Sequence, residues 1–320
     1  MNTIRTAVIG VGYLGRFHAQ KYAQNPASTL VAVVDRDAGA RERVAGELAT
    51  QALADYRPLL GKVDAVSVAT PTPAHFEIAA AFLRAGAHVL VEKPITELPA
   101  EARDLVALAR TNGRVLQVGH LERFNPALRA AEPHLTTPRF IESQRLAPYK
   151  ERGTDVNVVL DLMIHDIDLI QSITRSEILS VEAIGSPVFS DAIDIANARI
   201  TFRNGCVANT TASRVSLKSE RKLRIFEDAA YLSLDLQQKI LTLIRKRRGA
   251  PEPGQLPVTI EEASFEQGDA LASEIEAFLA AVMNGTAPLV SGEDGLRALE
   301  TALQITAQVN AGLAARRGDP

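Results

Sequence analysis

Three side chains of this chain have types and positions that suit proton chemistry: Lys93, Asp161 and His165. Lys93 lies within Glu92-Lys93-Pro94, directly after an apolar run over residues 88–91. If that run is a strand of a parallel sheet, Lys93 follows its carboxyl end, where such sheets bind ligands. We therefore expect Lys93 to act on a ligand through its charge or its chemistry.

Asp161 and His165 are four residues apart within a segment, roughly 155–173, that has the pattern of a long helix. This spacing places both side chains on one helix face, and Asp168 follows one turn later. The arrangement suits an oriented acid–base pair, a metal site, or a polar helix face packed against another domain. Because no second histidine lies close by in the sequence, we predict that no metal ion binds here.

The segment from Gly10 to Gly15 matches the pattern G-x-G-x-x-G, with Tyr13 and Leu14 between the second and third glycines. It follows the first apolar run and precedes a helical pattern, which is the context that dinucleotide binding requires. Gly10 suits the tight turn, Gly12 lets the backbone approach a pyrophosphate, and Gly15 lets the helix pack on the strand. The helix N-terminus then offers N–H groups to the phosphates.

Asp35 ends the second apolar run, 20 residues after Gly15, and Arg36 follows it. A carboxylate at this place accepts hydrogen bonds from the adenosine ribose and repels a 2′-phosphate. Asp35 therefore predicts NAD as the cofactor, whereas Arg36, which could bind a 2′-phosphate, leaves NADP as the alternative.

The first 119 residues alternate short apolar runs with helix-length segments, which predicts a doubly wound parallel sheet covered on both faces. The expected strands are 6–9, 30–34, 65–69, 88–91 and 115–118, and the expected helices are 14–24, 37–49, 73–85 and 99–112. We therefore expect a dinucleotide-binding Rossmann domain over residues 1–119.

The pattern changes over residues 120–320, which predict a second domain with antiparallel strands for substrate binding and oligomerisation. The expected strands are 181–184, 196–202, 207–214, 223–226, 231–234 and 240–244. Asn204-Gly205 is a strong hairpin signal, residues 249–257 suggest a surface loop, and two helices are expected over 269–284 and 292–312, with Ser291 as N-cap of the second.

Composition limits the classes of function. The chain has 320 residues and a formal net charge of −3, so it has no general attraction for nucleic acid or anionic membranes. Its single cysteine, Cys206, excludes an intrachain disulfide, and no apolar run approaches the ~20 residues of a membrane span. We expect a cytoplasmic protein.

These motifs occur together with Thr70, Pro71 and His75 after the fourth predicted strand, and the chain resembles the glucose–fructose oxidoreductase/inositol dehydrogenase (Gfo/Idh/MocA) family over nearly its whole length. The resemblance implies a Rossmann domain followed by a domain with a large open mixed sheet. It also implies NAD(P)-dependent oxidation or reduction of sugar and cyclitol carbons. Lys93, Asp161 and His165 would form the catalytic set, with Thr70, Pro71, His75 and Glu92 around the nicotinamide half of the cofactor.

A sugar hydroxyl must lose a proton as its carbon loses hydride. The reference pKa of histidine, ~6.5, makes His165 the better general base at neutral pH, while Lys93 stabilises the developing negative charge on the oxygen. Asp161 would orient the imidazole of His165 or the ammonium of Lys93 and balance its charge. The reverse assignment, with Lys93 as the base, remains open, and Pro94 is expected to fix the approach of Lys93 through a cis bond.

The stretch from Gly119 to Pro126, together with D-L-M-I-H-D-I-D, resembles the branch of this family that includes UDP-N-acetylglucosamine 3-dehydrogenases. A nucleotide diphosphate needs cations and a stacking partner. The candidate cations are Arg123, Arg145, Lys150 and Arg152, the candidate for stacking is Tyr149, and the further candidate substrate ligands are His120 and Asn125. Surface charges and structural hydrogen bonds at the domain junction are the alternative roles of these residues.

Two other functions remain open: a dehydrogenase of cyclitols or free sugars, and a cofactor-binding regulator without catalysis. The presence of Lys93 and His165 argues against the regulator. An open sheet in the second domain leaves a face that needs cover, so we expect a homodimer or homotetramer.

Overall fold

The computed structural model describes residues 3–149, 156–247, 249, 255–266 and 268–317. The chain divides into two compact units, the first formed by residues 1–124 and 269–299 and the second by 125–268 and 300–320. The predicted boundary at residue 120 lies close to this division. However, residues 269–299, which the sequence assigned to the second domain, cluster with the first.

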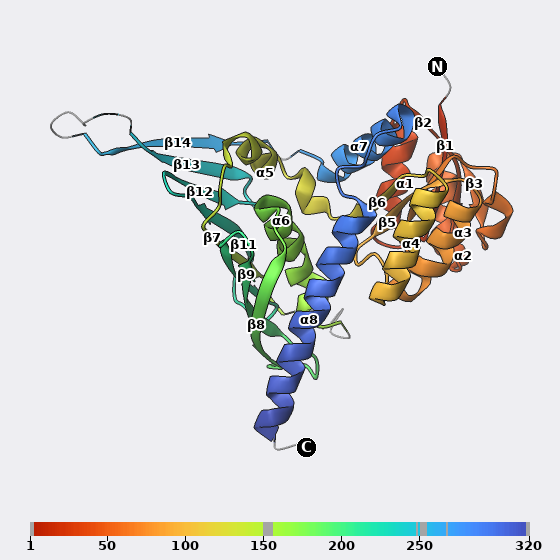
Figure 1. The fold of residues 1–320 in the computed structure, drawn as a ribbon. Coiled ribbons are helices and arrows are strands. Elements are labelled where there is room, and N and C mark those ends of the chain that lie inside the picture. The colour runs from red at the N-terminus through yellow and green to blue at the C-terminus, as the bar shows by residue number, and fades with distance from the viewer. Residues whose placement is uncertain (1–2, 150–155, 248, 250–254, 267, 318–320) are drawn as a thin grey trace. The chain divides into compact units, whose positions relative to one another are not determined.

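The first unit contains a parallel six-stranded sheet in the order β3-β2-β1-β4-β5-β6 (Figure 1). Its strands are β1 (Ile4–Ile9), β2 (Ser28–Val34), β3 (Gln51–Leu53), β4 (Ala65–Val68), β5 (His88–Glu92) and β6 (Leu116–Gly119). The central strands are buried along most of their length, which explains their near-continuous runs of Val, Ile, Leu and Ala.

Helices cover this sheet, and 3₁₀ turns join them to the strands. The helices are α1 (Gly15–Gln24), α2 (Ala38–Leu48), α3 (His75–Arg84), α4 (Pro99–Thr111) and α7 (Ala270–Asn284), and the turns are η1 (Arg57–Leu59), η2 (Thr72–Ala74) and η3 (Leu121–Phe124). Although α7 comes late in the chain, it packs against α1 through Ile275, Phe278 and Leu279, which share one apolar cluster with Tyr22. Lys21 and Asp269 form an ion pair of 2.6 Å beside this contact.

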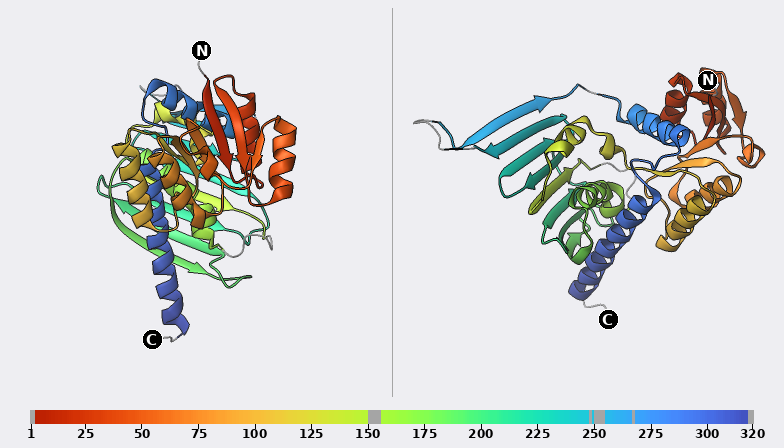
Figure 2. Two further views of the ribbon diagram at one scale, coloured as in Figure 1. Left: turned by 90° about the vertical axis from the view of Figure 1, so that its right-hand side faces the viewer. Right: turned by 45° about the horizontal axis from the view of Figure 1, so that its top comes forward.

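The second unit contains a mixed eight-stranded sheet in the order β14-β13-β12-β11-β7-β10-β9-β8, which Figure 2 shows from two further directions. Its strands are β7 (Phe140–Leu146), β8 (Ile178–Ser186), β9 (Ile195–Phe202), β10 (Val207–Ser213), β11 (Glu220–Phe226), β12 (Ala230–Asp235), β13 (Ile240–Lys246) and β14 (Val258–Ser264). Only β7 and β10 pair in parallel, so the sheet is mixed as the family resemblance implied.

The helical elements of the second unit are α5 (Pro126–Ala131), η4 (Glu132–His134), the π-helical turn η5 (Val159–Met163) and α6 (Ile164–Thr174). The last helix, α8 (Gly292–Arg317), begins in the first unit and ends in the second. The cap predicted at Ser291 is present, since its hydroxyl accepts from the N–H of Asp294 and the Asp294 carboxylate accepts from the N–H of Ser291.

The Asn204-Gly205 hairpin joins β9 to β10, with Gly205 at φ +85°. The sequence patterns did not predict β3, β7, β14 or α5. The proposed loop over 249–257 lies largely outside the described residues. Within the part of the chain that the structure describes, no helix combines the length and the apolar character of a membrane span.

Candidate active site

The glycine turn between β1 and α1 has the geometry of a phosphate-binding loop. A Cβ on Gly15 would lie 1.8 Å from the carbonyl oxygen of Gly10, so helix and turn pack too closely for any side chain there. A Cβ on Gly12 would meet nothing within 4 Å, so the backbone at this point faces open space. Tyr13 and Leu14, between them, are exposed. This tight turn with one open face fits the pyrophosphate of a dinucleotide.

Asp35, at the end of β2, is held by the same turn. Its Oδ2 accepts a hydrogen bond from the N–H of Val11 at 2.8 Å, and its Oδ1 accepts one from the N–H of Asp37 at 2.9 Å. The carboxylate is half-buried and each oxygen retains a further lone pair for a ribose hydroxyl. Arg36 is exposed beside it.

The peptide bond between Lys93 and Pro94 is cis, as predicted. Lys93 is half-buried and directly follows β5. His75 connects this segment to the end of β4. One nitrogen of its buried ring lies 2.9 Å from the carbonyl oxygen of Pro94, and the other lies 2.8 Å from that of Thr70. His75 therefore fixes two backbone segments at the carboxyl edge of the sheet, while Pro71 is exposed beside them.

Glu92, at the end of β5, makes two hydrogen bonds within the first unit. Its Oε1 lies 2.9 Å from Nε2 of His18, and its Oε2 accepts from the N–H of Lys93 at 3.3 Å. A Cβ on Gly119, in the neighbouring strand, would lie 2.8 Å from this carboxylate, so the glycine makes room for it. Sequence reasoning missed His18, although its position three residues after Gly15 on α1 marks it as a helix residue facing the sheet.

Asp161 and His165 lie at the start of the long helical segment of the second unit, and both are half-buried. Asp161 belongs to the π-helical turn η5, and His165 belongs to the first turn of α6. The predicted helix is present, but it begins with a π-helical turn. Because π-turns are rare and often mark functional sites, the irregularity supports a role for this pair.

Two arginines proposed as phosphate ligands have other partners. Arg145 is buried and forms a bidentate ion pair with Asp166, with N–O distances of 3.0 and 2.9 Å. Arg123 is largely buried in the first unit, 3.9 Å from Asp294. Their burial and their ion pairs favour a structural role for both arginines over phosphate binding. Lys150 and Arg152 lie outside the described residues.

Asn125 has a structural role too. Its Oδ1 accepts from the N–H of Ala127 and so caps α5, while its Nδ2 donates to the carbonyl oxygen of Leu236 at 2.8 Å. The side chain is buried, which favours the structural alternative over substrate binding. His120 is also buried, just before η3.

Tyr149 retains the features of a stacking residue. Its half-buried ring meets the exposed ring of Phe189 edge-on, with centroids 5.4 Å apart. The turn that carries Phe189 is fixed by Asp194, whose Oδ2 accepts from three successive backbone N–H groups, those of residues 188–190.

Asp194 is itself held by Arg214, whose Nε donates to Oδ1 at 2.8 Å. Although burial alone would raise the pKa of Asp194, hydrogen bonds from Arg214, Ser190 and the backbone lower it well below the usual range. The carboxylate therefore stays ionised and keeps the turn in place.

Comparison with known proteins agrees with both units. Residues 4–120 match the family model described as "Oxidoreductase family, NAD-binding Rossmann fold", and residues 128–233 match "GFO/IDH/MocA C-terminal domain". The chain belongs to the Gfo/Idh/MocA family. It is thus an NAD(P)-binding oxidoreductase of the sugar dehydrogenase type, as the motifs predicted.

Several members of the Gfo/Idh/MocA family are similar over nearly the full length. A UDP-N-acetylglucosamine 3-dehydrogenase of Acidithiobacillus ferrooxidans is 42% identical, with 96% of this chain and 98% of that protein aligned. A solved structure of that dehydrogenase covers 97% of this chain and 99% of its own, with a TM-score of 0.91. An inositol 2-dehydrogenase of Rhizobium meliloti is 29% identical over 94% of this chain and 95% of that protein.

Proposed function

We propose that this protein oxidises the C3 hydroxyl of UDP-N-acetylglucosamine to a ketone with NAD⁺. The observation that carries the proposal is the 42% identity to the UDP-N-acetylglucosamine 3-dehydrogenase, which extends over both units, compared with 29% to the inositol 2-dehydrogenase. Identity over both units matters because the second unit contains the residues assigned to the substrate.

Lys93, Asp161 and His165 carry the chemistry in this proposal. His165 accepts the hydroxyl proton of the sugar, and the Lys93 ammonium hydrogen-bonds the same oxygen and stabilises its growing negative charge. Asp161 orients the imidazole and balances its charge once it is protonated. Bound NAD⁺ supplies the acceptor for the hydride that leaves the sugar carbon. The atoms balance, since alcohol becomes ketone, one proton goes to His165 and one hydride goes to the nicotinamide.

The cofactor lies along the carboxyl edge of the first sheet in this account. The turn from Gly10 to Gly15 holds the pyrophosphate, and Asp35 accepts hydrogen bonds from the adenosine ribose, which favours NAD over NADP. Thr70, Pro71 and His75 shape the nicotinamide end. Tyr13, which is 70% exposed beside the turn, covers the cofactor from the solvent side.

The uridine end of the substrate belongs to the second unit in this account. Tyr149 stacks on the base, and Phe189 keeps the tyrosine ring in place by its edge-on contact. Lys150 and Arg152 are the cations that bind the negatively charged diphosphate, since Arg145 is already paired with Asp166.

We further propose a homo-oligomer, built through the eight-stranded sheet. Large apolar side chains on its strands are exposed, among them Leu179 and Ile184 of β8 and Ile260 of β14. A second copy of the chain would cover them. Light scattering on the purified protein should give two or four times the chain mass of 34.4 kDa, and a mass of 34.4 kDa would contradict the proposal.

The substrate assignment is tested by following NADH formation with UDP-N-acetylglucosamine, myo-inositol and simple hexoses in parallel. We expect turnover of the nucleotide sugar, with a kcat/KM at least ~100-fold above that of the polyol, or about 2.7 kcal/mol. Good turnover of myo-inositol without turnover of any nucleotide sugar would replace the proposal with a cyclitol dehydrogenase. The absence of turnover with every substrate, combined with tight NAD⁺ binding, would point to a sensor.

A further inference from the structure

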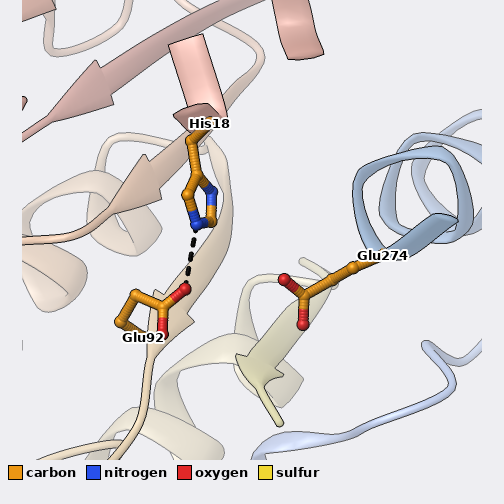
Figure 3. A group of neighbouring side chains, drawn as sticks. All are labelled: His18, Glu92 and Glu274. Carbon is orange, nitrogen blue, oxygen red and sulfur yellow. Dashed lines mark hydrogen bonds and ion pairs between the residues drawn. The ribbon is translucent and has the colours of Figure 1, made fainter. Parts of the chain in front are cut away.

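A cluster of three buried side chains lies inside the first unit, behind the strand end that carries Lys93. His18 comes from α1, Glu92 from the end of β5 and Glu274 from α7, and Figure 3 shows all three turned toward one point. One potential ligand atom from each lies within 4.8 Å of the others. Residues far apart in the chain thus place one imidazole nitrogen and two carboxylates around a common centre.

Glu274 is the unusual member of the cluster. Its side chain is completely buried, and among the described residues neither carboxylate oxygen has a hydrogen-bond partner. Figure 3 shows the carboxylate pointing from α7 toward His18 and Glu92. Burial, and then the nearby charge of Glu92, raise the pKa of Glu274 well above its usual value. A buried carboxyl group without hydrogen bonds costs free energy unless something compensates it.

We propose that His18, Glu92 and Glu274 bind one divalent transition-metal ion. A neutral imidazole and two carboxylates carry two negative charges, which a divalent ion cancels. An imidazole nitrogen combined with carboxylate oxygens suits Zn²⁺ or Mn²⁺, whereas Mg²⁺ and Ca²⁺ prefer oxygen ligands alone. The same ion would give both oxygens of Glu274 the partner that the protein does not supply.

The surroundings of the cluster resemble the outer shell that metal-binding histidines need. Nδ1 of His18 lies 3.1 Å from the hydroxyl of Ser67, and that hydroxyl lies 2.8 Å from the hydroxyl of Tyr22. Without a metal, Nε2 donates to Oε1 of Glu92 and Nδ1 accepts from the Ser67 hydroxyl. When a metal binds, Nδ1 would donate to Ser67 instead, which leaves Nε2 unprotonated and available to the ion. Burial raises the pKa of Tyr22, although the hydrogen bond with Ser67 lowers it in part, so the phenol keeps its proton.

The ion would have a structural role and an entry path. It would connect α1, β5 and α7 and so fasten α7 to the first unit. The side chain of Glu92 is 12% exposed while that of His18 is fully buried, so an ion would enter past Glu92. The hydride transfer proposed above uses no metal, and this inference is independent of it.

The test uses the full-length protein, stripped of metal with a chelator and then mixed with Zn²⁺, Mn²⁺ or Mg²⁺. Bound metal is measured after gel filtration, and the melting temperature is measured alongside. We expect one Zn²⁺ or Mn²⁺ per chain, a raised melting temperature, and neither effect with Mg²⁺. Glu274→Gln should weaken Mn²⁺ binding at least tenfold, while Glu276→Gln, an exposed neighbour on the same helix, should bind like the wild type.

The metal-free variants provide the control for folding. Glu274→Gln removes a buried ionisable group without changing the shape of the side chain, so without metal it should melt no lower than the wild type. Visible spectroscopy of the Co²⁺-loaded wild type tests for a nitrogen and oxygen ligand set without any variant. A wild type that binds no Zn²⁺ or Mn²⁺, or a Glu274→Gln variant that binds Mn²⁺ equally well, would overturn the proposal in favour of a proton shared by the two carboxyls.

Discussion

Val11 donates its backbone N–H to Oδ2 of Asp35 at 2.8 Å, so the residue expected to recognise the ribose is tied directly to the phosphate-binding turn. The N–H of Asp37 holds the other oxygen at 2.9 Å. Recognition of the ribose and of the pyrophosphate is thus coupled through one carboxylate, whose position is set by the backbone on both sides.

This coupling makes Asp35 the control point for cofactor choice. Asp35→Asn keeps an oxygen that can accept from Val11 but removes the charge that repels a 2′-phosphate, and Arg36 stays available. We expect the ratio of kcat/KM for NADP⁺ to that for NAD⁺ to rise about tenfold, or ~1.4 kcal/mol. Asp37→Asn, which affects the cap of α2, should leave the ratio unchanged. An unchanged ratio in Asp35→Asn would contradict the role of Asp35.

The assignment of the general base can be tested by chemical rescue. If His165 takes the hydroxyl proton, His165→Ala should lose about 10²–10⁴-fold in kcat, and added imidazole should restore part of the loss. The rescue should grow as the pH rises above ~6.5, because only neutral imidazole accepts a proton. Rescue of Lys93→Ala by a small amine, with no rescue of His165→Ala, would assign the base to Lys93 instead.

Tyr149 should contribute to binding rather than to chemistry. Removing a ring that stacks on the uracil base costs ~1–3 kcal/mol, so Tyr149→Ala should raise KM for UDP-N-acetylglucosamine about 5- to 150-fold and change kcat little. Leu217→Ala, at a fully exposed position of the same unit, serves as the control. A Tyr149→Ala variant with unchanged KM would place the base elsewhere.

His88 makes the first unit sensitive to acid. Burial, helped by the charge of Arg114, lowers the pKa of His88 from 6.5 to about 4, and the N–H of Val115 donates to its Nδ1, which must therefore stay unprotonated. Below pH 6.5 the unfolded chain binds a proton at His88, whereas the folded chain does not until about pH 4. The free energy of unfolding therefore keeps its full value above pH 6.5 and decreases as the pH falls toward 4.

Replacing His88 by asparagine, whose Oδ1 can accept from Val115, should remove this contribution. We expect the melting temperature of the wild type to fall more steeply between pH 7 and pH 4.5 than that of His88→Asn. Parallel curves for the two proteins would show that the histidine has an ordinary pKa.

The first sheet could be predicted from the sequence because its strands are buried on both faces. Apolar runs such as Val89 to Val91 clearly indicate buried strands, and the glycine motif identifies the turn between the first strand and the first helix. The three-residue β3 is too short to give a pattern. β7 alternates buried and partly exposed residues over Phe140–Leu146. Its polar residues Glu142, Gln144 and Arg145 interrupt the alternation of apolar and polar residues by which a strand is recognised.

The reacting groups could be found from the sequence because their motifs are local. Lys93 follows a strand, and Asp161 and His165 lie within one helical segment. The pairing of Arg145 with Asp166, the bond between His18 and Glu92, and the approach of Glu274 depend on tertiary packing. No local pattern contains that information, which is why the sequence predicted neither the ion pair of Arg145 with Asp166 nor the buried cluster of His18, Glu92 and Glu274.

The oxidised carbon is the central claim, and isotope transfer tests it most directly. UDP-N-acetylglucosamine with deuterium only at C3 is incubated with the enzyme and NAD⁺, and the NADH is analysed by mass spectrometry. We predict NADH heavier by one mass unit and a keto sugar without deuterium. NADH of ordinary mass, with the deuterium retained in the sugar, would contradict the account.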